Sequence, residues 1–182
     1  MQNTKIHIDP SSIPLQMVVA MDDNGGIGNS GKLPWPHSKK DMQLFQKLTK
    51  DAVVIMGRKT YEEIEEIRLA KDPEATELLP GRVCVVVSSR NISTKMNISV
   101  VKTLMDAIKY YYEDNKSIVI MGGLQLYIEA LPYVKHLHVT QFKKSFECDR
   151  FLPLPYLARH FRIVAGTQDE EAVYLTCDRV VL

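Results

Sequence analysis

Short apolar runs alternate along the chain with segments that place an apolar residue every three or four positions. Four runs are rich in valine and isoleucine and lack polar alternation, at residues 15–21, 53–56, 83–87 and 118–121. Such runs are typical of strands covered on both faces, as in parallel sheets. Helical periodicity fills the intervals, at residues 39–49, 60–67, 103–114 and 124–131. The pattern predicts an α/β fold with a mostly parallel central sheet and helices on both faces.

The rhythm changes toward the C-terminus. Residues 134–143, 160–166 and 172–181 have strand character, with a polar turn over 167–171 between the last two. Strands joined by so short a turn pair antiparallel. We therefore expect an antiparallel C-terminal edge on the sheet and a single domain over residues 15–182. Residues 1–14 are polar and contain two prolines, which fits a surface extension and neither a signal peptide nor a membrane span.

Composition narrows the class of protein. The chain has 182 residues, 45% apolar and 25% charged, which suits one soluble domain. Its net charge is +1, and its lysines are scattered and form no basic stripe. We therefore expect neither nucleic acid nor a membrane as partner. Three distant cysteines without a C-x-x-C pair argue against a disulfide framework and structural zinc. His136 and His138 lack a third ligand, so we expect no metal site. We predict a cytoplasmic protein that is a monomer, with an oligomer as the open alternative.

The stretch from Gly26 to Lys32 matches two phosphate-binding motifs, G-x-G-x-x-G and the first part of G-x-x-x-x-G-K. Both mechanisms require a helix to begin at once, so that its N-terminal amides can hold phosphate. Pro34 and Pro36 oppose that helix, because proline disfavours helical geometry in the residue before it. Leu33 also replaces the hydroxyl residue that binds magnesium. We interpret the stretch as a glycine-rich loop that can close over a ligand.

An acidic residue shares a helical face with apolar ones. Asp41, Leu44, Phe45 and Leu48 recur at helical spacing. A carboxylate on such a face requires a cationic or hydrogen-bonding partner, so a ligand with paired donors would suit Asp41. The stretch from Ser38 to Asp41 also has the spacing of a helix capping box, in which the acid folds back on its own helix. These residues alone leave both interpretations open.

Further motifs follow one another between Leu15 and the C-terminus. They are Val19-Ala20-Met21, Gly26-Ile27-Gly28, Leu33-Pro34-Trp35, Asp41 with Phe45, Val54 to Tyr61, Leu79 to Arg82, Val87 to Arg90, Met121-Gly122-Gly123, Tyr127, Thr140 and Asp149 to Pro153. In this order and at these spacings they resemble the dihydrofolate reductase family, which favours a ligand-facing Asp41. The resemblance implies that family's fold and the NADPH-dependent reduction of 7,8-dihydrofolate to 5,6,7,8-tetrahydrofolate. That reaction belongs to one-carbon metabolism and is an antifolate target.

The resemblance also implies roles for single residues. Asp41 would pair with a ring nitrogen and an exocyclic amine of the pteridine, and Thr140 would hydrogen-bond to the carboxylate or to the same amine. Trp35 would hold an ordered water, Leu33 would close over the nicotinamide, and Tyr127 would lie near that ring. With Asp41 and Thr140, these three residues form the implied catalytic set.

Substrate and cofactor contacts are implied as well. The substrate would contact Val18, Val19, Ala20, Phe45, Ile64, Leu79 and, through its glutamate tail, Arg82. NADPH would contact Ala20, Ile27, Gly57, Arg58, Lys59, Thr60, Ser88, Ser89, Arg90, Met121, Gly122, Gly123, Leu124, Gln125, Leu126 and Tyr127. The Gly122–Gly123 peptide is cis in the family. The arginines favour NADPH over NADH, because a cofactor without the 2′-phosphate would leave them without their strongest partner.

Three departures from the family pattern stand out. Residues 65–78 form a charged insertion, which we expect to be a solvated helix extension, the alternative being a lid. Leu124 and Gln125 replace a glycine and a basic residue, and Cys148 stands where glycine is frequent. Two other functions are weighed against the leading one: a same-fold pyrimidine reductase of the riboflavin-synthesis type, and a non-catalytic nucleotide-binding or assembly protein.

Overall fold

The computed structural model describes residues 13–112 and 116–180. Its main sheet contains the eight strands β1 (Leu15–Met21), β3 (Val53–Gly57), β4 (Val83–Val87), β5 (Ser99–Val101), β6 (Ile118–Ile120), β7 (Val134–Phe142), β9 (Phe161–Gln168) and β10 (Ala172–Arg179). Their order is β5-β4-β3-β6-β1-β7-β10-β9. The strands from β5 to β7 are parallel, whereas β10 pairs antiparallel with both β7 and β9. The predicted fold class and its antiparallel C-terminal edge are confirmed.

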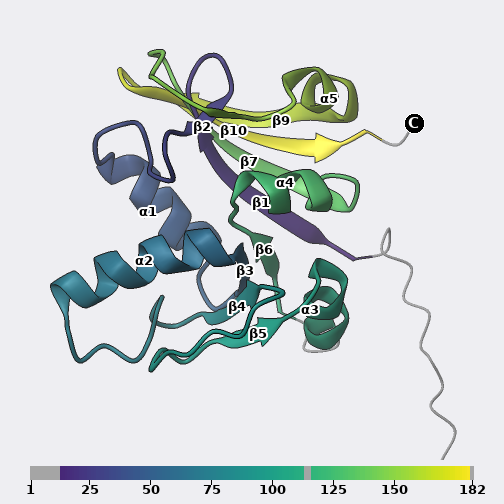
Figure 1. Cartoon of the computed structure of the whole chain (residues 1–182). Coiled ribbons are helices and arrows are strands. Elements are labelled where there is room, and N and C mark those ends of the chain that lie inside the picture. Colours follow the sequence, from purple (N-terminus) through teal and green to yellow (C-terminus); the bar gives the residue numbers. More distant parts are fainter. Residues whose placement is uncertain (1–12, 113–115, 181–182) are drawn as a thin grey trace, which may run out of the picture.

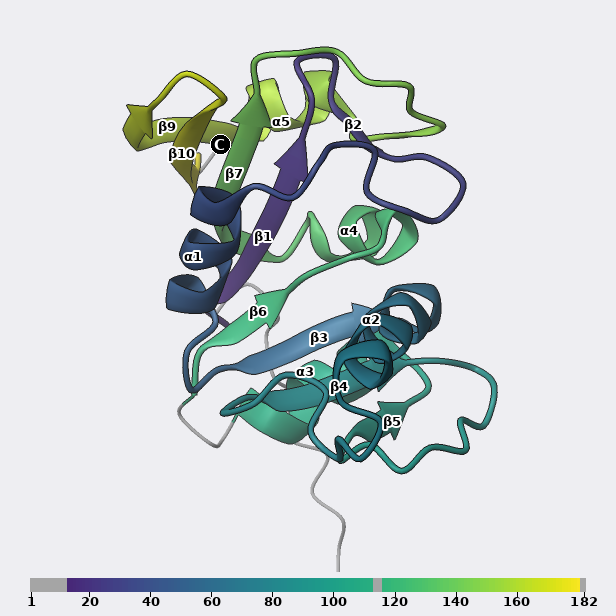
Figure 2. The same ribbon diagram turned by 90° about the vertical axis from the view of Figure 1, so that its left-hand side faces the viewer.

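In the part of the chain that the structure describes, five helices cover the sheet from two sides (Figure 1). They are α1 (Lys39–Leu48), α2 (Arg58–Lys71), α3 (Leu104–Tyr111), α4 (Leu124–Ala130) and α5 (Leu154–His160). Figure 2 shows α1 and α2 in front of the sheet, with β1 and β6 visible between them. The main core lies on the other face, where Ile108, Ala130 and Leu157 of the remaining helices pack against Leu15 and Met17. Helices on both faces are what continuous apolar strands require.

Burial differs among the parallel strands. All three residues of β6 are buried, as are Val53 to Met56 of β3, which matches the prediction of strands covered on both faces. The prediction is wrong for β1, where buried side chains alternate with half-buried Gln16, Val18 and Ala20. These three point to the side of α1 and α2, because alternate side chains of a strand face opposite ways. One face of β1 is therefore only partly covered.

Several short elements were not predicted. Strands β2 (Gly26–Gly28) and β8 (Arg150–Phe151) form a separate antiparallel pair. Strand β5 and helix α5 were also missed, since β5 has three residues and α5 contains Pro155. Pro155 lies in the first turn of α5, where a proline is tolerated because the amide has no partner within the helix.

The inserted segment 65–78 is partly helix and partly packed loop. Helix α2 continues through it to Lys71, as expected for a helix extension. Beyond the helix, Ala75 and Leu78 are buried in a second core with Met96. The backbone amide of Asn97 donates to the carbonyl of Thr76 at 2.6 Å. These contacts hold the end of the insertion against the segment that precedes β5, a placement unlike that of a free lid.

At the N-terminal side, Ile13 is buried at 2% exposure and belongs to the main core. The predicted extension covers residues 1–14. Residues 1–12 of it lie outside the described part of the chain. Within the described residues, no helix combines the length and the apolar character needed to cross a membrane.

Candidate active site

A half-buried strip of the sheet faces the space between α1 and α2. We call Val18 and Ala20 of β1, together with Met121 after β6, the strip. Val18 and Met121 pack against the core under α2, and Ala20 packs against the aromatic cluster beside α1. Ile64 of α2, and Leu79 in the segment after α2, are also partly buried against the same core. The strip therefore offers a flat apolar surface with helices on two sides.

Asp41 lies in the first turn of α1, above the strip. Ser38 caps this helix by accepting a hydrogen bond from the amide of Asp41 at 3.4 Å, and its own hydroxyl donates to Glu171 at 3.1 Å. The serine half of the predicted capping box is thus present. The Asp41 carboxylate instead interacts with the hydroxyl of Thr140, which is 3% exposed and lowers the pKa of Asp41. The carboxylate is directed to β7 and not to its own helix.

The charge of Asp41 is poorly stabilised by its surroundings. Burial raises the pKa of this carboxyl, and the Thr140 hydroxyl and the nearby His37 act in the opposite direction without offsetting it. No residue of α1 is fully buried, and Phe45 is half-buried on the same face. A ligand with two hydrogen-bond donors would therefore stabilise the charged form of Asp41.

Aromatic side chains close the upper end of the strip. Trp35 is 8% exposed and packs on Phe142 with 4.8 Å between ring centroids. Phe146 meets the Trp35 ring edge-on at 5.9 Å. Two residues before the tryptophan, Leu33 is 59% exposed. An apolar side chain this exposed is available to cover a bound ring.

Helix α2 approaches the same loop from across the strip. The carboxylate of Glu63 on α2 faces the backbone amide of Leu33 and the ammonium group of Lys32. Burial raises the pKa of Glu63, while these two partners lower it. This interaction links α2 to residues 32–33 of the loop.

Glycines bring three backbone segments close together beside Tyr127. The Gly122–Gly123 peptide is cis, as the family resemblance implied, and the amide of Gly57 donates to the carbonyl of Gly122 at 2.7 Å. Gly122 has φ +108°, and a Cβ atom there would lie 3.0 Å from the Tyr127 ring. A side chain is therefore excluded at this position. Tyr127 is buried, and its hydroxyl donates to the carbonyl of Val18 at 2.8 Å.

Arg82 is held in a fixed orientation between α1 and the 79–81 turn. Its Nε donates to Thr49 Oγ1 at 2.9 Å, Nη2 donates to the carbonyl of Gln46 at 3.0 Å, and Nη1 donates to the carbonyl of Pro80 at 2.6 Å. Three hydrogen bonds fix the plane of the guanidinium group at the C-terminal end of α1. A planar, fixed cation suits recognition of a carboxylate.

The predicted phosphate-binding segments lie at the carboxyl ends of β3 and β4. Helix α2 begins at Arg58 after Gly57 and has no side-chain N-cap, so its first amides remain available to an anion. Thr60 lies beside Gly123, where a Cβ atom would come within 3.3 Å of the threonine hydroxyl. Arg58 itself pairs with Glu62 one turn along α2, and Lys59 is exposed.

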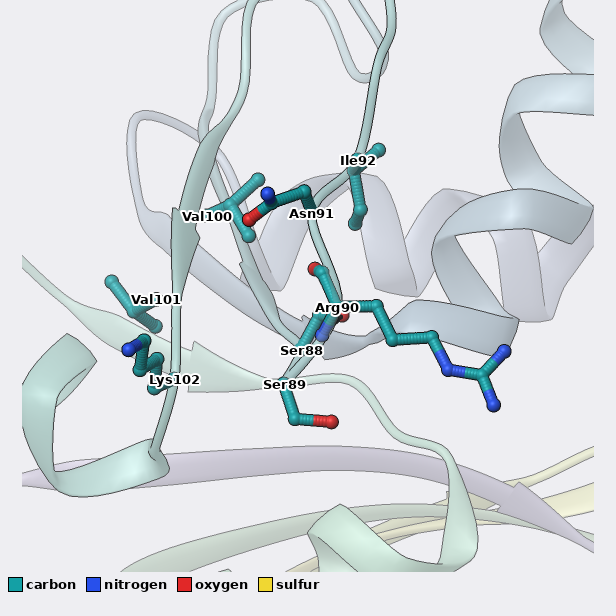
Figure 3. Close-up of a pocket in the computed structure, with 8 residues that line it drawn as sticks. All are labelled: Ser88, Ser89, Arg90, Asn91, Ile92, Val100, Val101 and Lys102. Atoms are coloured by element: carbon teal, nitrogen blue, oxygen red, sulfur yellow. Dashed lines mark hydrogen bonds between the residues drawn. The ribbon is translucent and has the colours of Figure 1, made fainter.

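A cavity of about 280 Å³ opens next to these segments (Figure 3). Its walls are formed by Ser88, Ser89, Arg90, Asn91, Ile92, Val100, Val101 and Lys102. In Figure 3 the β5 residues and Lys102 stand opposite the turn of Ser88 to Arg90, and the Arg90 side chain is directed away from β5. Lys102 was not predicted from the sequence as a residue of this cavity. The sequence feature that could have indicated it is a lysine directly after the apolar pair Val100-Val101.

Four predicted contacts differ in detail from the structure. Val19 is 3% exposed and points into the main core, so its side chain cannot pack on a ligand above Val18 and Ala20. Leu126 is likewise buried in that core, and Gln125 is exposed. The hydroxyl of Ser88 accepts from the amide of Arg90 at 3.0 Å and donates to the Arg90 carbonyl at 2.8 Å. Ser88 therefore shapes the turn, while Ser89 is exposed toward the solvent.

The remaining implied contacts lie close to the core. Ile27 and Leu124 are partly buried against the main core.

The two histidines of β7 pair with side chains: His136 Nδ1 lies 2.7 Å from Asp178 Oδ1, and His138 Nε2 lies 3.1 Å from Gln16 Oε1. Both histidines therefore have protein partners on the sheet.

The chain is similar in sequence to known dihydrofolate reductases. The family model described as dihydrofolate reductase matches residues 14–179. A dihydrofolate reductase of Bacillus subtilis is 34% identical over 163 residues, which cover 88% of this chain and 89% of the relative. A bifunctional dihydrofolate reductase-thymidylate synthase of Paramecium tetraurelia is 35% identical over 138 residues, or 75% of this chain. The matched region spans 27% of the bifunctional relative.

A solved structure extends the likeness to the fold. Dihydrofolate reductase from Enterococcus faecalis, complexed with NADP(H) and RAB-propyl, matches with a TM-score of 0.75 and 28% sequence identity. The match covers 91% of this chain and 95% of that one. From the family match over almost the whole described chain and from this agreement in fold, the chain belongs to the dihydrofolate reductase family.

Proposed function

We propose that this protein reduces 7,8-dihydrofolate to 5,6,7,8-tetrahydrofolate with NADPH as the hydride donor. The observation that carries the proposal is the Asp41 carboxylate, held above an apolar strip by one neutral hydroxyl and directed away from its own helix. Membership of the dihydrofolate reductase family supports the same reaction. The pteridine ring would lie over the strip, with Leu79 and Phe45 beside it.

Asp41 and Thr140 would orient the substrate. The ionised carboxylate accepts two hydrogen bonds, one from a ring nitrogen and one from the exocyclic amine, and a flat ring is thereby fixed in its plane. An analogue that cannot donate twice would leave a buried charge without partners, which is a large penalty. Arg82 would bind the carboxylate of the glutamate tail at the far end of α1.

The cofactor fits the residues on the opposite side of the strip. Available amides at the start of α2, the cation Lys102 and the Ser89–Arg90 turn form a donor set for phosphate groups. Gly122 leaves no room for a side chain next to Tyr127, so backbone can approach a nicotinamide there. When bound, NADPH supplies the hydride that reaches C6 of dihydrofolate.

Residues of the chain would exclude bulk water from the reacting rings and direct a proton to N5 of the substrate. Leu33 covers the reacting rings and excludes bulk solvent, which strengthens the electrostatic interactions beneath it. Trp35 holds one ordered water through its indole N–H. A water entering beside Leu33 delivers the proton to N5, while Asp41 stays ionised and favours the substrate form that accepts the proton.

The test is a spectrophotometric assay of NADPH oxidation in the presence of dihydrofolate. We expect dihydrofolate-dependent oxidation that a 2,4-diaminopyrimidine antifolate inhibits, because such a ring offers Asp41 two donors. Reactions lacking dihydrofolate are the control. Oxidation that requires a ribosylated aminopyrimidine instead would identify a pyrimidine reductase, and binding of NADPH without turnover of either substrate would identify a non-catalytic protein.

Preference for NADPH over NADH has a test of its own. Removing the cation in Lys102→Ala or Arg90→Ala should raise KM for NADPH roughly tenfold, the scale of one charge-assisted hydrogen bond, and leave KM for NADH unchanged. The NADPH preference should also weaken with added salt. Lys135→Ala, on β7 outside the cavity, is the matched charge control. Equal effects on both cofactors would contradict phosphate recognition by these residues.

A further inference from the structure

A second acidic side chain near the site is more deeply buried than Asp41. Asp22 follows the last residue of β1 and is 1% exposed. Its Oδ1 accepts hydrogen bonds from the amides of Asn24 at 2.9 Å and Gly26 at 2.7 Å. These bonds close the turn between β1 and β2, which precedes the loop that carries Leu33.

The other oxygen of Asp22 reaches a distant segment. Its Oδ2 accepts from the amide of Phe146 at 3.0 Å and lies 3.8 Å from the thiol of Cys148. Both residues belong to the stretch between β7 and β8, 124 and 126 positions further along the chain. One carboxylate thus joins two loops with four donors. Several donors of this kind allow a buried carboxylate to remain ionised without a cation beside it.

The joined segments border the proposed site. Phe146, whose amide is bound by Asp22, packs edge-on against Trp35 at 5.9 Å. Gly26, whose amide is also bound, leads into β2 and the loop that ends at Leu33. At Gly26 a Cβ atom would lie 2.5 Å from the Cys148 sulfur, so the two loops meet at a distance that only glycine allows.

Neighbouring hydrogen bonds extend the same junction. The amide of Asp149 donates to the carbonyl of Gly28 at 2.9 Å, and the amide of Ser30 donates to the Asp149 carboxylate at 3.0 Å. These two bonds lie on the exposed side, where water competes with them. Asp22 is the buried member of the junction, and a buried hydrogen bond to a charged group is worth more than an exposed one.

We propose that Asp22 is a positioning residue for the proposed reaction, which sets the packing of Phe146 on Trp35 and the placement of residues 26–33 over the strip. This inference rests on the proposed function for its kinetic part. Asp22 touches neither of the proposed ligands. It acts through Phe146 on the tryptophan and through Gly26 on the loop that carries Leu33.

Asp22→Asn is the test variant. Asparagine keeps the shape of the side chain and one carbonyl acceptor, but its NH₂ group replaces the acceptor that faces the Phe146 amide. Trp35 is the only tryptophan in the chain, so intrinsic fluorescence reports on this position alone. We expect red-shifted emission and stronger acrylamide quenching at a temperature where circular dichroism shows the variant to be folded.

The kinetic readout is kcat for NADPH-dependent reduction of dihydrofolate. Misplacement of catalytic elements by about 1 Å costs up to about 100-fold, so we expect kcat to fall between about 10-fold and 100-fold, with the affinity for NADPH retained. Asp23→Asn is the matched control. Asp23 is exposed and accepts a hydrogen bond from the Ser145 hydroxyl at 2.7 Å, and its substitution should change neither the fluorescence nor kcat.

A second variant keeps the test decisive if Asp22→Asn does not fold. Phe146→Leu retains the amide that Asp22 binds but removes the aromatic contact with Trp35, and it should reproduce the fluorescence change and the fall in kcat. A folded Asp22→Asn protein with wild-type quenching, or with wild-type kcat, would overturn the proposal. If the wild-type protein does not reduce dihydrofolate, the proposed function fails, and Trp35 quenching still decides whether Asp22 positions the aromatic pair.

Discussion

Asp22 follows the last residue of β1, Asp41 interacts with Thr140 on the neighbouring β7, and the surroundings of these two carboxylates differ sharply. Asp22 is almost fully buried and accepts hydrogen bonds from three backbone amides and a thiol. Burial raises its pKa, but the amides of Phe146, Gly26 and Asn24 outweigh burial and bring the pKa below the ordinary value of 3.8. Asp41 has one hydroxyl partner and a nearby histidine, and its pKa lies above 3.8 because burial dominates.

The contrast separates a structural acid from an acid that is available to a ligand. A fold that supplies four donors has used the carboxylate to stabilise itself. A fold that supplies one leaves acceptor capacity free, and this lowers stability in exchange for recognition. The following predictions test whether the two acids fall on opposite sides of this division.

The largest expected effect is the loss of turnover in Asp41→Asn. The amide cannot accept two hydrogen bonds from the pteridine, nor does it carry the charge that favours protonation of N5. We expect kcat/KM for dihydrofolate at pH 7 to fall by about 10²-fold to 10⁴-fold, the usual range for a positioned acid or base. Steady-state kinetics measure this, with NADPH binding by fluorescence titration as the control. Full turnover would reject the assignment of Asp41.

Asp22→Asn should cause the largest loss of stability. Leaving buried donors without a charged acceptor costs about 2 kcal/mol at pH 7, measurable by urea unfolding. Because the folded pKa of Asp22 is lowered, its contribution is present above the unfolded value of 3.8 and is lost as pH falls through the folded pKa. The gap between wild type and variant should therefore narrow in acid. A gap independent of pH would contradict an ionised Asp22.

Asp41→Asn should change stability in the opposite direction. The folded pKa of Asp41 is raised, so its contribution is full below 3.8 and is lost as pH rises through the folded pKa. At pH 7 the neutral amide should be more stable than wild type by about 1 kcal/mol. The same unfolding series checks this. Destabilisation at pH 7 would place Asp41 with Asp22 among the structural acids.

Thr140→Val removes the hydroxyl partner of Asp41. The pKa of Asp41 should then rise further, so the acidic limb of the kcat/KM profile should move to higher pH. The substitution removes the hydroxyl but leaves the half-buried Asp41 carboxylate, which water can still reach, and we expect a loss of stability of about 1 kcal/mol. Thr176→Val is the matched control. Thr176 lies on β10, on the same face of the sheet as Thr140, and is paired with His138 and not with Thr140. An unmoved limb would show that Thr140 does not tune Asp41.

His37→Gln should have the smallest effect. His37 lowers the pKa of Asp41 by its charge, but its side chain is exposed and water screens the interaction. The acidic limb should move in the same direction as in Thr140→Val, and by less. Added salt should abolish the difference from wild type. A salt-independent shift larger than that of Thr140→Val would contradict the ordering.

Elements with a clear local pattern could be predicted from the sequence. Strands β3, β4 and β7 and helix α1 were placed within one or two residues, because continuous apolar runs mark β3 and β4 and helical periodicity marks α1. Strands β2, β5 and β8 were missed because they have two or three residues and no continuous apolar run longer than two residues, whereas the equally short β6 lies in the apolar run 118–121. The error at Val19 was avoidable, since alternation along β1 puts it opposite Val18 and Ala20.

The site divides in the same way. Asp41 could be singled out because its apolar neighbours lie within one or two turns of a single helix, and the ordered motifs of the family favoured the ligand-facing interpretation over the capping one. No residue near Asp22 in the chain indicates that Phe146 and Cys148 will bind it, and no residue near Val101 indicates that Lys102 will line the same cavity as Ser89. Those partners are brought together by the crossover order of the sheet.

The sequence by itself determined the α/β architecture, the family and the acid that faces the strip, because each of these is encoded in local spacing or in an ordered set of motifs. Tertiary structure decided which carboxylate is satisfied and which is left with spare acceptor capacity. The physical reason is that the pKa and the role of an acid depend on burial and on donors from distant segments, and only folding brings those donors to it.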